Sequence, residues 1–185
     1  HLLVESGAAQ VLLTSRSGLV AQHRGQSLDA WLAPLLTGAV SSAKVCDVSD
    51  RNEVKMLYWA APSVSQCLSS TCLEGILHAA GSSGKLGRLD MRQSALDFSE
   101  CFASKGRAAA HLFCATAQVM LRTYLSFSST ASLWDNLGLG SYASANAAME
   151  GLSTCKSSQG VQASTVMWPQ VTGTMGMGAA AITAG

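Results

Sequence analysis

Residues 123–168, TYLSFSSTASLWDNLGLGSYASANAAMEGLSTCKSSQGVQASTVMW, decide the fold class. They open with TYLSFSS (123–129), a short run with aromatic and apolar residues that predicts a strand. The Ala-rich segment 141–160 predicts a helix that ends at Gly160, and the apolar run 161–168 predicts another strand. A strand, a helix and a strand in this order form one unit of a parallel sheet.

The same alternation extends toward the N-terminus. Short apolar runs that end in small or polar residues predict three earlier strands, at VLLTSRSG (11–18), AKVCDVSD (43–50) and LEGILHAAG (73–81). Helices are expected up to Gly7, around residues 28–36, after a cap at Ser49 and over residues 98–121. Pro62–Thr71 is expected to be a surface loop or a frayed helix end. We therefore predict one α/β domain over residues 1–185, with a Rossmann-like, doubly wound parallel sheet.

Composition excludes several classes of protein. Hydrophobic residues make up 48% of the 185 residues, charged residues only 12%, and the net charge is +1, unlike a disordered tail or a nucleic-acid binder. No apolar run approaches the ~18 residues of a membrane span. The six Cys form no CxxC pair, so we expect no metal site, and mostly core cysteines in a reducing compartment. The expected location is the cytoplasm, or a plastid in a photosynthetic eukaryote.

Polar side chains with a chemical use gather around the segment 123–168. Tyr142 and Asn146 are four residues apart and share one face of the predicted helix, while Ser129 ends the strand before it. A phenol has a pKa near ~10 and is a weak acid at neutral pH unless a cation favours the phenolate. Lys105, in FASKGRAAAHL, is the predicted cation. Ser128 is the alternative to Ser129.

Together these residues resemble the ketoreductase domain of type I modular polyketide synthases, a branch of the short-chain dehydrogenase/reductase superfamily. The similarity covers nearly the whole chain, through SRSG, CDVSD, HAAG, the Lys105 segment, FSS, SYASANA and a final W…GMG region. The spacings match the catalytic pattern of the family: 24 residues from Lys105 to Ser129, 13 from Ser129 to Tyr142 and four from Tyr142 to Asn146. Free-standing members of the superfamily usually exchange the Lys and the Asn.

The resemblance implies a reductase. In the family, residues at these positions act on a ketone: Tyr142 would donate a proton to the carbonyl oxygen, and Ser129 would hydrogen-bond the same oxygen. Lys105 would lower the Tyr pKa and contact the nicotinamide ribose, and Asn146 would support the proton relay. The implied reaction is the NADPH-dependent reduction of a β-ketoacyl thioester on an acyl carrier protein, beside neighbouring synthase domains.

The resemblance also assigns cofactor-binding residues. Arg16 and Ser15, at the end of a strand, suit the 2′-phosphate of NADPH, because a guanidinium pairs with phosphate in a bidentate way. An acidic residue there would have favoured NAD. The remaining residues match an adenine-contacting pair and a turn of small residues, namely Asp47, Val48, Ala79, Ala80 and Gly81. His78 is expected to be a satisfied, buried residue beneath the cofactor.

Stereochemistry is predicted from two positions. In the family, a Trp eight residues before the Tyr marks A-type reductases, which give the L-hydroxy product, and Trp134 occupies that place. HAAG continues as SSGKLG, without the Leu-Asp-Asp signature of B-type enzymes. Position 139 is Leu139 and not the His of reductases that act on epimerised substrates. We therefore expect an A-type reductase with an unepimerised α-carbon.

The sequence departs from the family at its ends. The first strand and glycine-rich loop of the nucleotide fold are not found in it, nor is the usual structural subdomain, so we expect a truncated catalytic domain that binds NADPH weakly by itself. Two alternatives stay open: a fatty-acid synthase ketoreductase, and a structural or epimerising domain without reductase turnover. A free-standing alcohol dehydrogenase is disfavoured by Asn146 and by the upstream Lys105.

Overall fold

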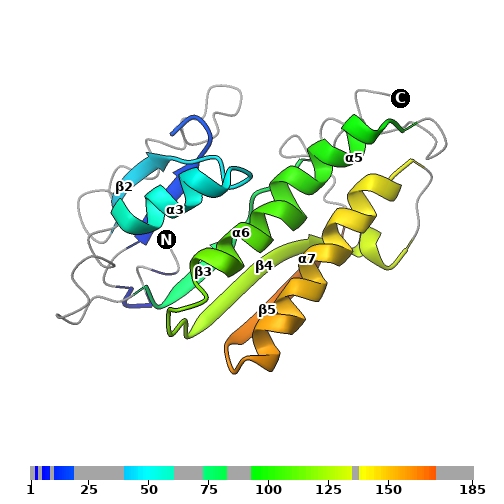
Figure 1. Cartoon of the computed structure of the whole chain (residues 1–185). Coiled ribbons are helices and arrows are strands. Elements are labelled where there is room, and N and C mark those ends of the chain that lie inside the picture. Colours follow the sequence, from blue (N-terminus) through cyan, green and yellow to red (C-terminus); the bar gives the residue numbers. More distant parts are fainter. Residues whose placement is uncertain are drawn as a thin grey trace. The chain divides into compact units, whose positions relative to one another are not determined.

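The fold is known from a computed structural model, shown in Figure 1. The residues it describes are residue 3 and residues 6–8, 11–18, 40–60, 73–82, 93–134 and 138–169. The chain divides into two compact units, His1–Asp47 and Val48–Gly185, which are described separately. The helix expected around residues 28–36 and the loop at Pro62–Thr71 lie outside the described residues.

The first unit contains two parallel strands, β1 (Val11–Ser15) and β2 (Val40–Val45). The strand predicted within residues 11–18 is confirmed as β1, whereas β2 begins three residues before the predicted start at residue 43. The expected stop at Gly7 is also found: Gly7 has φ 91°, and the Ala8 N–H donates to the Leu3 carbonyl at 2.9 Å. Such a bond closes a helix whose last residue is left-handed, a conformation that favours glycine.

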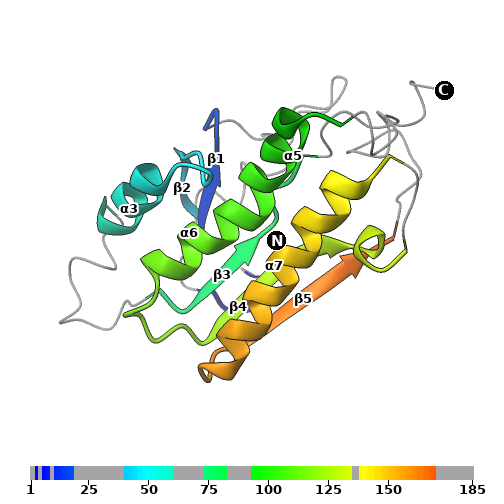
Figure 2. The ribbon, with the colours of Figure 1, turned by 45° about the vertical axis from the view of Figure 1, so that its right-hand side comes forward.

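The second unit is built on three parallel strands in the order β3, β4, β5 (Figure 2). Their bounds are Gly75–His78, Thr123–Ser129 and Gln162–Trp168, and the prediction for β4 is confirmed residue for residue. β3 ends opposite Ser126, while β5 continues as far as Ser129. The last three residues of β4 therefore have β5 as their only strand partner among the described residues.

Helices cover one face of this sheet. Figures 1 and 2 both show the helices α5 and α6 beside α7, in front of the three strands. The helical elements also include α3, a π-helical segment η2 and a short 3₁₀ turn η3. Their bounds are α3 Arg51–Ala60, α5 Ala95–Phe102, η2 Ala103–Arg107, α6 Ala108–Ala115, η3 Thr130–Ser132 and α7 Gly140–Ser158. Parallel strands joined through helices confirm the predicted α/β fold class.

The helix expected over residues 98–121 differs from the prediction in three ways. It begins earlier, because Ser94 and Asp97 form a capping box in which each side chain accepts a hydrogen bond from the other's backbone N–H. It contains a π-helical segment, η2. It ends at Ala115, where the Thr116 hydroxyl donates to the Leu112 carbonyl at 2.7 Å and satisfies a helix-end acceptor.

The cap of α3 also differs from the prediction. The cap was expected at Ser49, and it is the Asp50 carboxylate that accepts hydrogen bonds from the backbone N–H groups of Asn52 at 2.7 Å and Glu53 at 3.2 Å. A carboxylate at this place also interacts favourably with the helix dipole. No helix in the described part of the chain is long and apolar enough to cross a membrane.

Small residues bring the two main helices close together. Ala108, Ala109 and Ala145 are fully buried. At Gly106 an added Cβ would lie 3.1 Å from Phe102 Cδ1 and 3.4 Å from the Ala148 methyl group on α7. Because contacts at this distance leave little room for a side chain, Gly106 permits the close approach of η2 to α7. That approach decides how near the neighbouring Lys105 comes to α7.

Candidate active site

Lys105 lies at the centre of the candidate site. Its side chain is 3% exposed, and its Nζ donates a hydrogen bond to the Phe127 carbonyl of β4 at 2.9 Å. The same Nζ lies 5.6 Å from the centroid of the Tyr142 ring on α7, within the range of a cation–π contact. Lys105 belongs to η2, and π-helical turns occur frequently at functional sites. One buried cation thus connects η2, β4 and α7.

The pKa of Lys105 is lowered from 10.5 to about 8, chiefly because burial disfavours its charged form. The thiol of Cys101 and the carboxyl of Glu150 act in the opposite direction and raise it. A pKa of about 8 keeps the amine largely protonated at neutral pH. Tyr142 therefore has a positive charge next to its ring, as a catalytic phenol requires.

Tyr142 and Asn146 lie one turn apart on α7, as predicted. The Asn146 side chain is fully buried, and its Nδ2 donates to the Tyr142 carbonyl at 2.8 Å. Its Oδ1 has no hydrogen-bond partner among the residues that the structure describes. Buried acceptors are normally satisfied, so this oxygen marks a place where a donor from water or a ligand would be stabilised.

Gln93 fixes the beginning of α7. Its Nε2 donates to the Gly138 carbonyl at 2.9 Å, and its Oε1 accepts from the Ser141 N–H at 3.2 Å, the second residue of the helix. Cys101 adds a buried contact, with its Sγ 3.5 Å from the Ser141 Oγ. Neither Gln93 nor Cys101 was found by the sequence analysis, because both act across 40 or more residues and belong to no recognisable motif.

The two serines at the end of β4 have different hydrogen-bond partners. The buried Ser128 donates its hydroxyl hydrogen to Glu150 on α7. Ser129 is half-buried, and its Oγ accepts a hydrogen bond from the Ala131 N–H at 3.2 Å. A hydroxyl that only accepts keeps its own hydrogen available. Within the described structure, Ser129 is therefore the one of the pair that has a donor to offer a ligand.

The first group of residues predicted to bind the cofactor lies in the His1–Asp47 unit. The turn after β1 is tight: the Ser15 carbonyl accepts from the N–H of Gly18 at 3.2 Å and of Cys46 at 2.9 Å. Gly18 has φ 70°, and an added Cβ would lie 2.8 Å from a Val45 methyl, so only glycine fits. Arg16 stands exposed in this turn, with no ion-pair partner among the described residues. Asp47 follows β2.

The second group lies in the Val48–Gly185 unit. Val48 is held by His111, whose Nδ1 lies 3.3 Å from the Val48 carbonyl oxygen. Ala79, Ala80 and Gly81 follow β3 directly, and two of these three residues are exposed. Their small side chains leave the backbone accessible at the carboxyl end of the strand, where parallel sheets bind ligands.

His78 is only partly satisfied, in contrast to the expectation. It is 3% exposed, and its Nε2 has no hydrogen-bond partner within the described residues. Burial lowers its pKa from 6.5 to about 4; a hydrogen bond to the backbone of Lys105 raises it, and the charge of Lys105 lowers it further. The imidazole is therefore neutral at physiological pH and supports the backbone of the segment that carries Lys105.

Acid is expected to destabilise the protein through His78. The folded pKa, about 4, lies below the value of 6.5 in the unfolded chain, so between these values only the unfolded chain binds the proton. The free energy of unfolding should fall by about 2–3 kcal/mol between about pH 7 and pH 4.5. Chemical denaturation at both pH values measures this loss, and His78→Asn should abolish it. A His111→Asn variant, which keeps His78, should retain it; an acid loss that survives in His78→Asn would contradict the assignment.

The two residues from which the stereochemistry was predicted flank a part of the chain that the structure does not describe. Trp134 is 72% exposed, and its backbone N–H donates to the Thr130 carbonyl at 3.0 Å. Leu139 is half-buried, and its carbonyl accepts from the Ala143 N–H at 2.7 Å in the first turn of α7. An exposed indole near the end of β4 offers a large apolar surface to a ligand.

No cluster of three or more His, Cys, Asp or Glu side chains that could hold a metal ion occurs among the described residues. The four described cysteines are free thiols. Cys46 and Cys101 are buried, as expected, but Cys114 and Cys155 are exposed, so the expectation that most cysteines belong to the core is wrong for these two.

A family model described as the KR domain matches residues 1–173. The chain belongs to this family of ketoreductase domains. Polyketide synthase GfsB from Streptomyces halstedii is 33% identical over 171 residues, which are 91% of this chain and 3% of that protein. Erythronolide synthase EryA3 from Saccharopolyspora erythraea is 30% identical over 90% of this chain and 5% of its own length. The KR domain therefore spans a small part of the synthases that it matches.

Solved structures agree with this assignment. An A-type ketoreductase from a modular polyketide synthase superposes with a TM-score of 0.74 at 30% identity, covering 90% of this chain and 33% of that one. A 7α-hydroxysteroid dehydrogenase in complex with NADH shares the fold, with a TM-score of 0.62 at 19% identity, over 82% of this chain and 56% of that one. The KR domain thus has the fold of the short-chain dehydrogenases and belongs to a family of oxidoreductases.

Proposed function

We propose that the KR domain reduces a β-ketoacyl thioester, carried on an acyl carrier protein, to the β-hydroxyacyl thioester with NADPH. The observation that carries the proposal is the buried Lys105 ammonium, which contacts the Tyr142 ring and is tied to β4 at 2.9 Å. Lys105 thus contacts Tyr142, one turn before Asn146 on α7, and bonds to β4 two residues before Ser129. In a chain that belongs to the ketoreductase family, this arrangement favours proton donation to a ketone oxygen.

Ketone reduction places negative charge on the carbonyl oxygen, and the site supplies donors for it. The Ser129 hydroxyl hydrogen stabilises this oxygen, and the Tyr142 hydroxyl transfers a proton to it. The Lys105 ammonium stabilises the resulting phenolate by its charge. The Asn146 Oδ1, which has no partner within the described residues, accepts a hydrogen bond from water and so contributes to reprotonation of Tyr142.

The residues present fit a nicotinamide dinucleotide. NADPH, when bound, supplies the hydride. The exposed Arg16 offers guanidinium donors to a 2′-phosphate, and the Ala79–Gly81 segment lets a ligand approach the backbone. An ammonium has three donors, so Lys105 retains two after its bond to Phe127, enough to contact a ribose hydroxyl.

Product configuration and partners form part of the same proposal. The exposed Trp134 and the half-buried Leu139 favour an A-type reductase with an unepimerised α-carbon. An acyl carrier protein and neighbouring synthase domains are the proposed partners, since the matched relatives are synthases many times longer than this chain. The whole 1–185 chain is proposed to contribute to one catalytic domain.

NADPH consumption with a β-ketoacyl N-acetylcysteamine thioester tests the reaction, on the 185-residue chain and on the full-length gene product. Reduction is expected, with the L-hydroxy product. If NADPH binds and is not consumed, the reductase proposal is wrong. Exchange of the α-proton under those conditions would assign an epimerising role instead.

Arg16 tests the choice of cofactor. Arg16→Ala is expected to raise the KM for NADPH by ~10–100-fold, which corresponds to the loss of charge-assisted hydrogen bonds to a phosphate. The KM for NADH, which has no 2′-phosphate, should change little. Lys44→Ala removes another positive charge from the same unit and serves as the control. Equal changes for both cofactors would rule out recognition of the 2′-phosphate by Arg16.

A further inference from the structure

Glu150 is a charged residue of α7 that the proposed reaction does not use. It lies two turns after Tyr142 and one turn after Asn146, so it follows the two proposed catalytic residues along the helix. Its Oε1 accepts the hydroxyl hydrogen of Ser128, which is 4% exposed. Ser128 stands directly between Phe127, the acceptor for Lys105, and Ser129. Glu150 therefore contacts β4 at the point where the site is built.

This end of β4 needs support from outside the sheet. β3 stops opposite Ser126, so the following three residues pair with β5 only, among the strands described. Two hydrogen bonds from the helical elements hold these residues: Lys105 of η2 bonds to the Phe127 carbonyl, and Glu150 of α7 accepts from the Ser128 hydroxyl. A hydrogen bond to a charged acceptor is stronger than one between neutral groups. The Glu150 contact therefore fixes the position of the next residue, Ser129, relative to α7.

The carboxylate of Glu150 also acts on Lys105 by its charge. Among the residues that the structure describes, four titratable side chains face the Lys105 ammonium: His78 from β3, Cys101 from α5, and Tyr142 and Glu150 from α7. Of these, His78 is neutral at physiological pH. The thiol of Cys101 and the carboxyl of Glu150 both raise the Lys105 pKa against the effect of burial.

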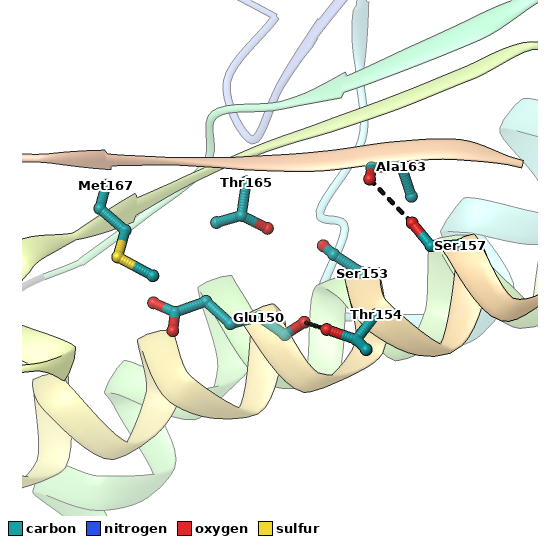
Figure 3. A pocket seen from close by; sticks show the side chains of 7 residues that line it. All are labelled: Glu150, Ser153, Thr154, Ser157, Ala163, Thr165 and Met167. Atoms are coloured by element: carbon teal, nitrogen blue, oxygen red, sulfur yellow. Dashed lines mark hydrogen bonds between the residues drawn. The ribbon is translucent and has the colours of Figure 1, made fainter.

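Access to water permits this role. Glu150 is half-buried and lies at one end of a groove of about 320 Å³ between α7 and β5. Figure 3 shows its carboxylate at the Met167 end of the groove, with Ser153, Thr154 and Ser157 farther along α7. A carboxylate that keeps contact with water avoids most of the cost of burying a charge.

We propose that Glu150 is a positioning residue of this site, which holds the end of β4 through Ser128 and supports the charge of Lys105. The inference rests on the proposed reductase function for its kinetic consequences, but not for its structural ones. Glu150 thus has two roles, a hydrogen bond to Ser128 and a charge near Lys105, and different variants remove them one at a time. Ser128→Ala removes the hydrogen bond to Glu150 and keeps the Glu150 charge. Glu150→Gln removes that charge and keeps a side-chain acceptor for Ser128.

The effect of the Glu150 charge on Lys105 is tested by the titration of Lys105, measured by NMR on protein with labelled lysine side chains. Glu150→Gln should lower the Lys105 pKa, because it removes a negative charge that favours the ammonium. The alkaline limb of the kcat profile should move in the same direction. Glu100→Gln, the same change on α5, is the matched control and should leave both unchanged. An unchanged Lys105 titration in Glu150→Gln would overturn the electrostatic role.

The positioning role of the Ser128–Glu150 hydrogen bond is tested by measuring kcat. Ser128→Ala should lower kcat by ~10-fold, since a small displacement of a catalytic group is costly, and should leave the Lys105 titration as in the wild type. Wild-type kcat in a folded Ser128→Ala variant would overturn the positioning role. If the wild type itself reduces no ketone, the proposed function fails, yet the NMR titration still decides whether Glu150 acts on Lys105.

Discussion

Replacing Tyr142 with Phe is expected to lower kcat for ketone reduction by about 10²–10⁴-fold, the usual contribution of a positioned proton donor. The variant keeps the ring that contacts Lys105 and loses only the hydroxyl. Because Asn146 bonds to the Tyr142 backbone and not to its side chain, the helix should be undisturbed. The KM for NADPH should therefore change little, and the loss should be confined to turnover, measured by NADPH consumption.

Tyr124 provides a matched control for this experiment. It is also a tyrosine of the second unit, 1% exposed, and burial raises its pKa to about 12. Its hydroxyl has no hydrogen-bond partner within the described part of the chain. Tyr124→Phe should keep wild-type turnover and raise the free energy of unfolding by about 1 kcal/mol, since an unsatisfied buried hydroxyl is costly. If Tyr142→Phe kept turnover within about tenfold of the wild type, the proton would have to come from another group.

Much of the fold follows from local patterns that the sequence displays. The strands β4 and β5 and the helix α7 are bounded by abrupt changes of composition, and their predicted limits agree with the structure to within two residues. The start of α5 is harder to predict from the sequence, because the hydrophobic pattern marks the helix itself and not its cap. The local signal for this start is Ser94 followed three residues later by Asp97, which together form the capping box.

The only parts of the candidate site that could be predicted from the sequence are those that follow from the spacing between residues. Tyr142 and Asn146 share a helix face, and the Lys105 to Ser129 spacing followed a family pattern. The π-helical turn around Lys105 has no sequence signature, since it depends on how Gly106 packs against α7. The link from Ser128 to Glu150 spans 22 residues and two elements, so only the folded chain reveals it.

Lys105→Met is expected to abolish detectable turnover and to change how stability depends on pH. The folded pKa of Lys105, about 8, lies below its value of 10.5 in the unfolded chain. Below about pH 8 both states carry the proton, and the folded state bears the full cost of the buried charge. As the pH rises toward 10.5, the folded state releases the proton while the unfolded chain retains it, so the wild type becomes more stable relative to the variant.

The size of this effect is measurable by chemical denaturation. Between about pH 7 and pH 10, the wild type should gain about 2–3 kcal/mol relative to Lys105→Met. Lys156 is a suitable control for turnover, because its ammonium is also buried but lies 4.3 Å from the Phe113 ring, near the far end of α7. Lys156→Met should therefore retain reductase activity. A wild type and Lys105→Met variant with parallel pH profiles would mean that the ammonium is not buried in solution. In that case the Lys105 ammonium would not be held beside the Tyr142 ring, as the proposed role of Tyr142 requires.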